Sequence, residues 1–367
     1  MRLEITHTSP EFDTYRSSRV QSLFNVEEAH QFTISADLPI EDMDWTLGLI
    51  VGPSGSGKTS LGARVFSQDR RYQAAWPDDQ PIIEAIAPER AFDDVTAALA
   101  AVGLGSVPAW LRPFHVLSNG EKFRAELARI ICEQPSEVVI DEFTSVVDRQ
   151  IARIGALAFG KAWRRTGGRA VLLSCHYDII DWLDPDWIYD TATGAFTGRY
   201  LRRRPKIQLE IRETNWRWWP HFEPHHYLKL PHMIAATCYV GFVEGEPVAH
   251  VAFSTRPGMA EARACRLVVM PEWQGAGVGV RFLNAVCAQW RRGNNRYGKP
   301  LLTLFHTSHP GLAAALRRDR MWAQVSAVLY GPGKQKSALG RGMKTGYGGH
   351  LRAIQGFRYV EGAEDAP

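Results

Sequence analysis

The sequence predicts an α/β protein with two domains, at residues 1–200 and 201–367. A chain of 367 residues is longer than one hydrophobic core usually supports. Two short apolar runs are each followed by a glycine-rich turn and an amphipathic stretch, a pattern typical of strand–loop–helix units. The balance of charge also changes sign near residue 200. Together these observations favour two α/β domains over one large domain.

The two halves of the chain carry opposite net charge. Residues 1–200 hold 19 Lys and Arg against 28 Asp and Glu, and residues 201–367 hold 24 against 11. This asymmetry indicates two domains with different partners, the basic one facing an anion, although many basic domains are simply solvated. We place the boundary in the basic, proline-containing run 199–206, after a turn-rich hairpin at 191–198.

Composition excludes several classes of protein. The chain is 45% hydrophobic and 22% charged, as expected of a soluble globular protein. No run of eighteen apolar residues occurs, so no membrane span is expected, and the N-terminus has no secretory pattern. Five cysteines without a C-x-x-C pair favour a reduced, cytoplasmic protein over a disulfide scaffold.

A phosphate-binding loop follows the first apolar run, residues 47–51. The sequence G-x-x-x-x-G-K-[ST] lies here between an expected strand and an expected helix, the context that this motif requires. Glycines let backbone N–H groups converge on phosphate oxygens, Lys58 would reach the β- and γ-phosphates, and the Thr59 hydroxyl would hold Mg²⁺. The expected nucleotide-binding residues are Gly52, Pro53, Ser54, Gly55, Ser56, Gly57, Lys58, Thr59 and Ser60.

A pair of acids ends another expected strand, residues 137–140. Four apolar positions followed by Asp141 and Glu142 fit a Walker B site. Asp141 would organise Mg²⁺, and Glu142 would polarise the attacking water as a base or an orienter. A surface acid pair is the simpler alternative, but the phosphate loop makes it weak.

Beyond these loops, the N-terminal half resembles the ABC-type ATPases. The sequence Leu-Ser-Asn-Gly-Glu at 117–121 is similar to the signature of that family and precedes an amphipathic helix at 122–131. The run 145–148 resembles the D-loop, His176 the switch histidine, and Gln80 is the best Q-loop candidate. The resemblance covers about the first 200 residues.

The resemblance implies a mechanism for ATP. It implies a head-to-tail homodimer in which Ser118 and Gly120 of one protomer cap the γ-phosphate held by the other. It also implies catalytic roles for Glu142 and His176, and Mg²⁺ held through Thr59, Gln80 and Asp141. Asn119 and Glu121 depart from the family signature, and the stretch between Lys58 and Ser118 is short. The short stretch disfavours a transport role.

A second glycine-rich turn follows the apolar run 267–270 and precedes an amphipathic stretch at 280–290. It lacks the G-x-G-x-x-G spacing of dinucleotide-binding loops. Its spacing Q-x-x-G-x-G instead resembles the acyl-CoA pyrophosphate loop of the GNAT acyltransferases. This resemblance, over about residues 207–330, implies a GNAT-like α+β fold and the acyl-CoA-binding residues Val268, Val269, Gln274, Gly275, Ala276, Gly277, Val278 and Gly279.

The sequence offers several candidates for the general base of acyl transfer. The expected helix 310–317 lacks the tyrosine that many GNAT members use as an acid. We therefore expect acid–base work from the aromatic and histidine-rich segment 216–228, with His226 and Tyr227 as candidates. Three alternatives stay open: another histidine could serve as the base, histidines of this segment could bind a metal, and its tryptophans could stack on bases or simply pack in the core. The further candidates are His250, Glu272, His306 and His309.

The order of the two halves resembles a fused family of ABC-type ATPases joined to a predicted acetyltransferase. The second half is also distantly similar to Mom-type enzymes that modify DNA bases. With the basic charge and an acid-free Gly/Lys-rich segment at 331–349, this favours ATP-driven acyl transfer from acetyl-CoA or another acyl-CoA to nucleic acid. Two alternatives stay open: an ATP-gated N-acetyltransferase of a protein or small molecule, and a transporter ATPase with a regulatory GNAT domain.

Overall fold

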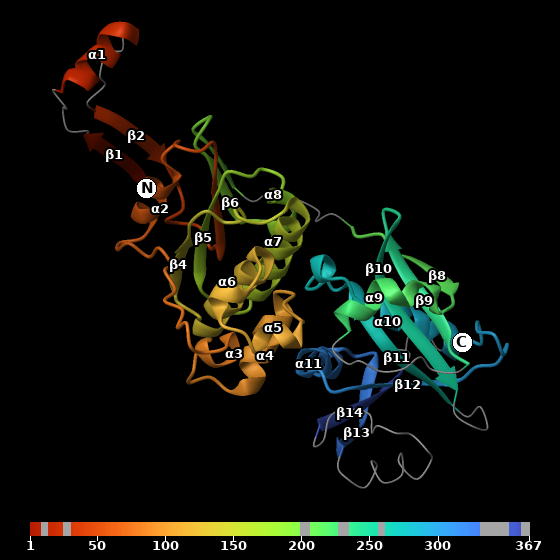
Figure 1. The fold of residues 1–367 in the computed structure, drawn as a ribbon. Coiled ribbons are helices and arrows are strands. Elements are labelled where there is room, and N and C mark those ends of the chain that lie inside the picture. The colour runs from red at the N-terminus through yellow and green to blue at the C-terminus, as the bar shows by residue number, and fades with distance from the viewer. Residues whose placement is uncertain are drawn as a thin grey trace. The chain divides into compact units, whose positions relative to one another are not determined.

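The computed structural model describes residues 1–8, 14–24, 31–198, 206–226, 235–255, 261–330 and 352–360. Their contacts divide the chain into two compact units (Figure 1). The first unit contains residues 1–74, 135–146 and 163–203, and the second contains 75–134, 147–162 and 204–367. The boundary expected near residue 200 falls in 199–205, outside the described residues, so the two-domain division stays a prediction.

A five-stranded sheet forms the centre of the first unit, in the order β4-β5-β3-β6-β7. The first four strands are parallel, and β7 pairs antiparallel with β6. All five residues of β3 are buried, as expected for a central parallel strand. These strands confirm the predicted α/β class, and their bounds are β3 (Leu47–Val51), β4 (Glu137–Ile140), β5 (Arg169–Ser174), β6 (Trp187–Asp190) and β7 (Ala195–Gly198).

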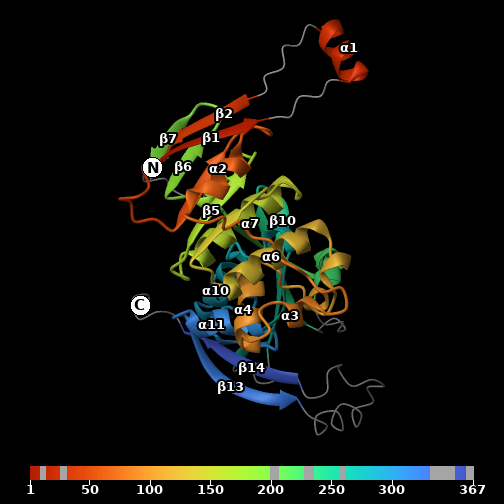
Figure 2. The ribbon, with the colours of Figure 1, turned by 90° about the vertical axis from the view of Figure 1, so that its left-hand side faces the viewer.

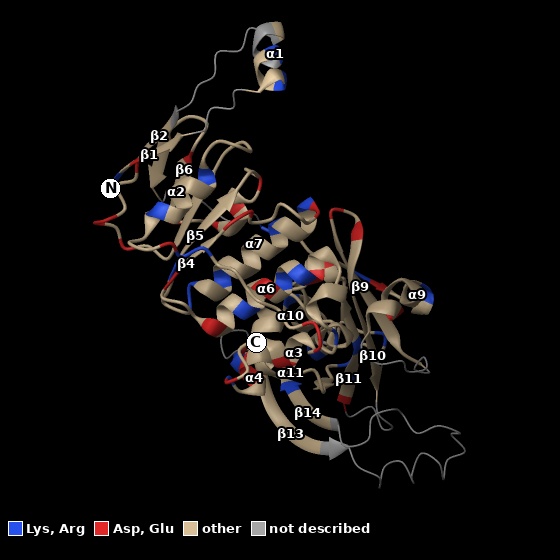
Figure 3. Ribbon diagram, turned by 60° about the vertical axis from the view of Figure 1, so that its left-hand side comes forward, with Lys and Arg blue, Asp and Glu red and all other residues tan. Residues whose placement is uncertain are grey.

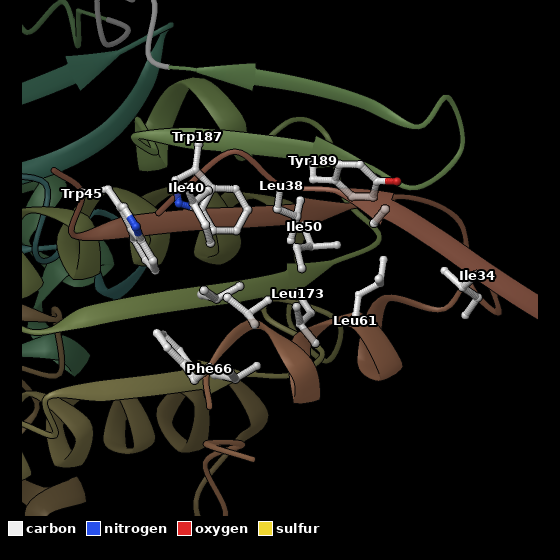
Figure 4. Packing of buried hydrophobic residues seen from close by; sticks show 14 residues of the cluster. Ile34, Leu38, Ile40, Trp45, Ile50, Leu61, Phe66, Leu173, Trp187 and Tyr189 are labelled. Carbon is white, nitrogen blue, oxygen red and sulfur yellow. The ribbon is translucent and has the colours of Figure 1, made fainter. Parts of the chain in front are cut away.

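An antiparallel hairpin of β1 (Arg2–Thr8) and β2 (Gln31–Asp37) completes the first unit (Figure 2). Its helices are α1 (Tyr15–Phe24), α2 (Lys58–Val65) and α8 (Ile180–Leu183). Figure 4 shows the buried core in which side chains of the β2 segment, the central sheet and α2 meet. Close packing of this kind fixes the end of β3, where the phosphate loop begins.

The second unit is built on a seven-stranded sheet in the order β13-β14-β12-β11-β10-β9-β8. Only β11 and β12 are parallel, and the other neighbours are antiparallel. The neighbours β9 and β10 form an antiparallel hairpin. The strands are β8 (Glu210–Thr214), β9 (Thr237–Val243), β10 (Glu246–Thr255), β11 (Glu261–Val269), β12 (Leu302–Thr307), β13 (Trp322–Tyr330) and β14 (Arg352–Tyr359).

Both faces of this sheet are covered. Tyr239 on β9 contacts α10, where the Trp290 indole N–H donates to its hydroxyl at 3.0 Å. Its neighbour Val240 points to the opposite face, as strand geometry requires, and packs with Trp219 and Phe222. The elements here are η2 (Trp216–Trp218), α9 (Trp219–Phe222), η3 (Glu223–His225), η4 (Pro271–Trp273), α10 (Val278–Arg291) and α11 (Pro310–Arg318).

A helical segment that lies between the two ATPase motifs in sequence belongs to the second unit. Its helix α4 packs against both α6 and α11. A Cβ added at Gly311 of α11 would lie 2.3 Å from the Cβ of Ala100 on α4, so these two helices approach closely. The segment contains α3 (Ile82–Ala85), α4 (Phe92–Ala101), α5 (Val107–Trp110), η1 (Phe114–Val116) and α6 (Asn119–Glu133), and most of α7 (Arg149–Trp163) joins it.

Candidate functional site

The predicted phosphate loop connects β3 to α2. Gly52, Gly55 and Gly57 all adopt positive φ, and Gly57 is the left-handed N-cap of α2, with φ 85° and ψ 11°. No side chain caps this helix. A Cβ at Gly55 would meet nothing within 4 Å, so the loop encloses open space. Backbone N–H groups around an open loop suit a phosphate group.

Lys58 folds back onto this loop. Its ammonium donates to the carbonyl oxygens of Gly52 at 2.9 Å and Pro53 at 2.6 Å. These carbonyls hold the cation beside the loop. The Ser56 hydroxyl and the Thr191 hydroxyl lie 2.5 Å apart and tie the loop to the turn after β6. The loop therefore has the charge and the N–H groups that a nucleotide phosphate requires.

The predicted acids and the histidine lie at the same edge of the sheet as the loop. Asp141 and Glu142 follow β4, and His176 follows β5, which lies between β4 and β3. The Glu142 backbone N–H donates to Asp141 Oδ1 at 2.8 Å. His176 Nδ1 lies 3.1 Å from the Thr144 hydroxyl. The carboxyl ends of parallel strands thus gather these side chains with Gly52, as a nucleotide site requires.

The signature-like motif begins α6. Ser118 is the N-cap, and its oxygen accepts a hydrogen bond from the Glu121 N–H at 3.4 Å. Glu121 in return accepts one from the Ser118 N–H at 2.9 Å, which completes a capping box. Glu121, which departs from the family signature, therefore stabilises the start of the helix. Gln80 is exposed, and with Ser118 and Gly120 it belongs to the second unit, so a role beside Lys58 stays a prediction.

The second predicted loop has the same local geometry as the first. Gly277 is the left-handed N-cap of α10, with φ 78° and ψ 10°, and no side chain caps that helix. A Cβ at Gly277 would meet nothing within 4 Å. Gly275, with φ 88°, is by contrast enclosed: its Cβ would lie 3.0 Å from the Cβ of Ala158. The open end of the loop is thus at Gly277.

The strand before this loop has a free edge. Within the described strands, β11 pairs with β12 only over residues 261–264, although β11 continues to Val269. The register against β10 shifts between His250 and Ala252, opposite Arg266, whose φ is 56°. This bulge turns the end of β11, so backbone groups near Val268 are available for a ligand. Gln274 donates its side-chain N–H to the Val269 carbonyl at 3.0 Å.

Aromatic rings surround His250 beneath this strand. Its ring centroid lies 5.1 Å from that of Trp219 and 5.5 Å from that of Phe222. Nδ1 lies 3.2 Å from the Arg266 carbonyl, and Nε2 has no hydrogen-bond partner among the described residues. Burial lowers the pKa of His250 to about 4. His250 is therefore neutral near pH 7.

The structure describes only some of the predicted acid–base candidates. His226 is buried, with its ring centroid 5.6 Å from that of Trp219. Tyr227 lies outside the described residues, as does the Gly/Lys-rich segment 331–349. His309 is occupied: Nδ1 accepts from the Leu312 N–H at 3.2 Å, so Nε2 carries the proton and donates to the Gly105 carbonyl at 3.1 Å. Within the described residues, no cluster of three or more His, Cys, Asp or Glu could hold a metal ion.

A further pocket lies elsewhere in the second unit. It has a volume of about 670 Å³ and is lined mainly by apolar residues of α3, α4 and α5, with His309 at its edge. Because both ring nitrogens of His309 are engaged, the pocket presents no free acid–base group from that residue.

Sequence reasoning missed the residues that meet the second loop. Gly103, Gly105 and Arg124 contact Pro271 and Gln274 by hydrogen bonds or close approach. Only the glycines at 103 and 105 gave any signal in the sequence, since paired glycines mark a close backbone approach. Arg124 gave none, because it looks like one basic position on an amphipathic helix.

Comparison with known proteins identifies a family for each half of the chain. The cytochrome c biogenesis ATP-binding export protein CcmA of Rhodospirillum rubrum is 30% identical over 161 residues, or 36% of this chain and 68% of that protein. The chain belongs to the ATP-binding cassette family. The model of the GNAT acetyltransferase family matches residues 208–314. This ABC protein therefore combines an ATPase with a GNAT acetyltransferase domain.

Other matches are shorter or more distant. The nickel import ATP-binding protein NikO of Rhodobacter capsulatus is 37% identical over 89 residues, which span 24% of this chain and about a third (34%) of that protein. A cobalt transport ATP-binding protein has a TM-score of 0.36 at 17% identity, over 52% of this chain and 80% of its own. A dimeric ABC cassette bound to ADP and Pi has a TM-score of 0.39 at 13% identity, over 55% and 99%. Among the described residues, no helix is long and apolar enough to cross a membrane.

Proposed function

We propose that this ABC protein uses ATP to control acyl transfer from acetyl-CoA or another acyl-CoA to nucleic acid. One observation carries the proposal: two loops in the same chain have the geometry of phosphate cradles. Gly57 and Gly277 have nearly equal backbone angles, and each starts a helix that no side chain caps. Such helix starts favour anions, here the phosphates of ATP and the pyrophosphate of CoA.

The first loop and the neighbouring strand ends would act on ATP. Lys58 would exchange its carbonyl partners for the β- and γ-phosphates, and the Asp141 carboxylate, with Thr59 and Gln80, would hold Mg²⁺. When bound, Mg²⁺ supplies positive charge beside the phosphates. Glu142 would orient the attacking water, with His176 nearby at the same sheet edge. These are the groups that the ATPase activity of the family would use.

A second protomer would complete the ATP site. In a monomer, Ser118 and Gly120 would have no role in ATP binding. In a head-to-tail dimer, they would contact the ATP that the partner holds. The Ser118 N-cap and the positive start of the 15-residue helix α6 suit a γ-phosphate. The Glu121 carboxylate, bonded to Ser118, is the one feature that would oppose an anion there.

The second loop and the free edge of β11 would hold the acyl-CoA. The loop from Gln274 to Gly279 would take the pyrophosphate, and the backbone near Val268 and Val269 would align the pantetheine arm. His226 and Tyr227 are proposed to remove or supply the proton of the acceptor, since histidine titrates near neutrality. The buried ring of Trp219 packs beside that of His226.

The proposed acceptor class follows from charge. Residues 201–367 carry 24 Lys and Arg against 11 Asp and Glu, more than one CoA pyrophosphate needs. In the described part, these basic residues are spread over several elements, including α10, β11, α11 and β14 (Figure 3). A polyanion such as nucleic acid can meet charges spread in this way.

Duplex DNA binding by the full chain tests the acceptor class. We expect affinity to fall at least about tenfold between 50 and 200 mM salt, because phosphate contacts release counterions. Saturating acetyl-CoA should leave DNA bound if the basic residues serve both ligands. Failure to bind DNA at 50 mM salt would contradict a nucleic-acid acceptor and favour a protein or small-molecule acceptor. A stable complex with a membrane subunit would favour the transporter alternative.

A further inference from the structure

The loop at residues 103–105 lies directly on the proposed acyl-CoA loop. The Gly105 N–H donates to Gln274 Oε1 at 2.9 Å, and the Gly105 carbonyl accepts from His309 Nε2 at 3.1 Å. Both backbone polar groups of Gly105 are thus used on the acetyltransferase side. All of these residues belong to the second compact unit. The contact therefore joins the helical segment to the loop that we propose for CoA.

Arg124 fixes the same contact from the signature helix α6. Its Nη1 donates to the carbonyl oxygens of Gly103 at 2.7 Å and Pro271 at 2.6 Å. The side chain is only 4% exposed, and burial lowers its pKa to about 10 although Glu272 opposes that shift. Among the described residues, Nε and Nη2 have no hydrogen-bond partner. A buried guanidinium with unused donors is costly, so the two carbonyl contacts of Nη1 are the polar interactions that hold Arg124 here.

The loop at 103–105 and the proposed acyl-CoA loop are in close steric contact. Gly103 has φ 85°, and a Cβ there would lie 2.2 Å from the Gln274 carbonyl oxygen. A Cβ at Gly275 would lie 3.2 Å from the Gly103 nitrogen. A displacement of Gly103 must therefore displace Gln274 and Gly275. Well-packed contacts of this kind transmit shifts because they deform poorly.

We propose that Arg124 and Gln274 are positioning residues that couple occupancy of the ATPase signature to the conformation of the acyl-CoA loop. The inference rests on the proposed function. Ser118, which would meet the partner's ATP, lies six residues before Arg124, about 9 Å along the same helix. ATP bound at Ser118 restrains α6, and the hydrogen bond from Arg124 transmits this restraint to Pro271. Because the two ligands order one contact, each binds more tightly when the other is bound.

The test is the dissociation constant of acetyl-CoA for the full chain, measured with and without the non-hydrolysable analogue AMP-PNP and Mg²⁺. We expect the analogue to tighten acetyl-CoA binding at least about fivefold, within the usual range of allosteric coupling. Arg124→Lys keeps the charge but replaces the planar guanidinium with an ammonium on a shorter side chain, so it should weaken the contacts to the two carbonyls and bring this ratio close to one. Arg129→Lys is the matched control on the same helix, since Arg129 also donates to a backbone carbonyl, that of Ala75. It should keep the ratio.

A second variant covers the case in which Arg124→Lys fails to fold. Gly105→Ala would place a Cβ 2.8 Å from Gln274 Oε1, the end of a flexible side chain, and should also reduce the ratio. A ratio of one or below in the wild-type chain overturns the proposal, as does loss of the ratio in Arg129→Lys. If acetyl-CoA does not bind at all, the proposed function fails. Hydrogen exchange at the amides of residues 275–279 then decides the coupling: protection by AMP-PNP supports it, and unchanged exchange overturns it.

Discussion

Arg124, on the helix that begins at the signature serine, donates a hydrogen bond to the Pro271 carbonyl 147 residues later in the chain. Pro271 begins the turn that leads into the proposed CoA loop. In this chain the helical segment between the two ATPase motifs is therefore part of the unit that holds the acetyltransferase sheet. The signature-like motif thus lies in the same unit as the proposed CoA loop, whereas the phosphate loop belongs to the first unit.

Replacing the proposed water-orienting acid should separate ATP binding from hydrolysis. Glu142→Gln removes the carboxylate but keeps the shape of the side chain, so the variant should bind ATP, lose most hydrolysis and persist as a dimer. Size-exclusion chromatography with ATP and a phosphate-release assay measure this. Hydrolysis at the wild-type rate would refute the assigned role of Glu142. The control is the conservative change Asp181→Asn, at an exposed position of α8, which should leave the rate unchanged.

A carboxylate in the second loop should abolish acyl-CoA binding and spare ATP hydrolysis. Gly277→Glu puts a negative charge at the helix start where the pyrophosphate is proposed, while Gly245→Glu is the matched control. Both glycines have positive φ, 78° and 86°, and a Cβ at either meets nothing within 4 Å. Their backbone strain is thus similar. If Gly245→Glu also abolishes acetyl-CoA binding, as followed by isothermal titration, the site at Gly277 is wrong.

Stability should fall in acid because His250 is buried in its neutral form. Its pKa is about 4 in the folded protein and near 6.5 in the unfolded chain, so the unfolded chain binds more protons between these values. This stabilising contribution is complete above pH 6.5. It decreases by about 3 kcal/mol as the pH falls to 4.

The matched pair of variants isolates this contribution. His250→Asn keeps an N–H that can reach the Arg266 carbonyl but does not titrate, so its urea midpoint should depend less on pH between 6.5 and 4. His221→Asn, at an exposed histidine, should keep the wild-type pH dependence. An unchanged pH dependence in His250→Asn would contradict the assignment.

A buried carboxylate supports the start of β3, the strand that leads into the phosphate loop. Asp186 Oδ2 accepts from the backbone N–H groups of Thr46 at 2.8 Å and Leu47 at 2.9 Å. Asp186→Ala leaves these buried donors unpaired, so it should lower the free energy of unfolding by about 3 kcal/mol. Chemical denaturation measures this, with Asp181→Ala on α8 as the exposed control. A loss below about 1 kcal/mol would contradict this role.

Local patterns predicted most of the elements that carry the two loops. The strands at 47–51 and 137–140 and the helix at 280–290 follow from apolar runs and periodicity, because those signals lie within a few neighbouring residues. The pairing of Gly105 with Gln274 could not be predicted in this way. Their 169-residue separation leaves no local signal, and α6 shows an ordinary amphipathic pattern at Arg124.

The bulge at Arg266 also could not be predicted from the sequence. A non-glycine residue with φ 56° follows no turn motif here, and its conformation depends on pairing with β10 across the sheet. The partial pairing of β11 with β12, which leaves the free edge near Val268, has the same non-local origin. Single-sequence patterns therefore predicted where the loops are but not what surrounds them.

The most direct test of the account is a binding measurement with both ligands on the full chain. Isothermal titration of acetyl-CoA into protein saturated with AMP-PNP should give one acetyl-CoA per chain, with no displacement of the nucleotide. Lys58→Ala should remove only nucleotide binding, and Gly277→Glu only acetyl-CoA binding. Absence of acetyl-CoA binding, or competition between the two ligands for one site, would contradict the claim that this chain holds two separate phosphate loops.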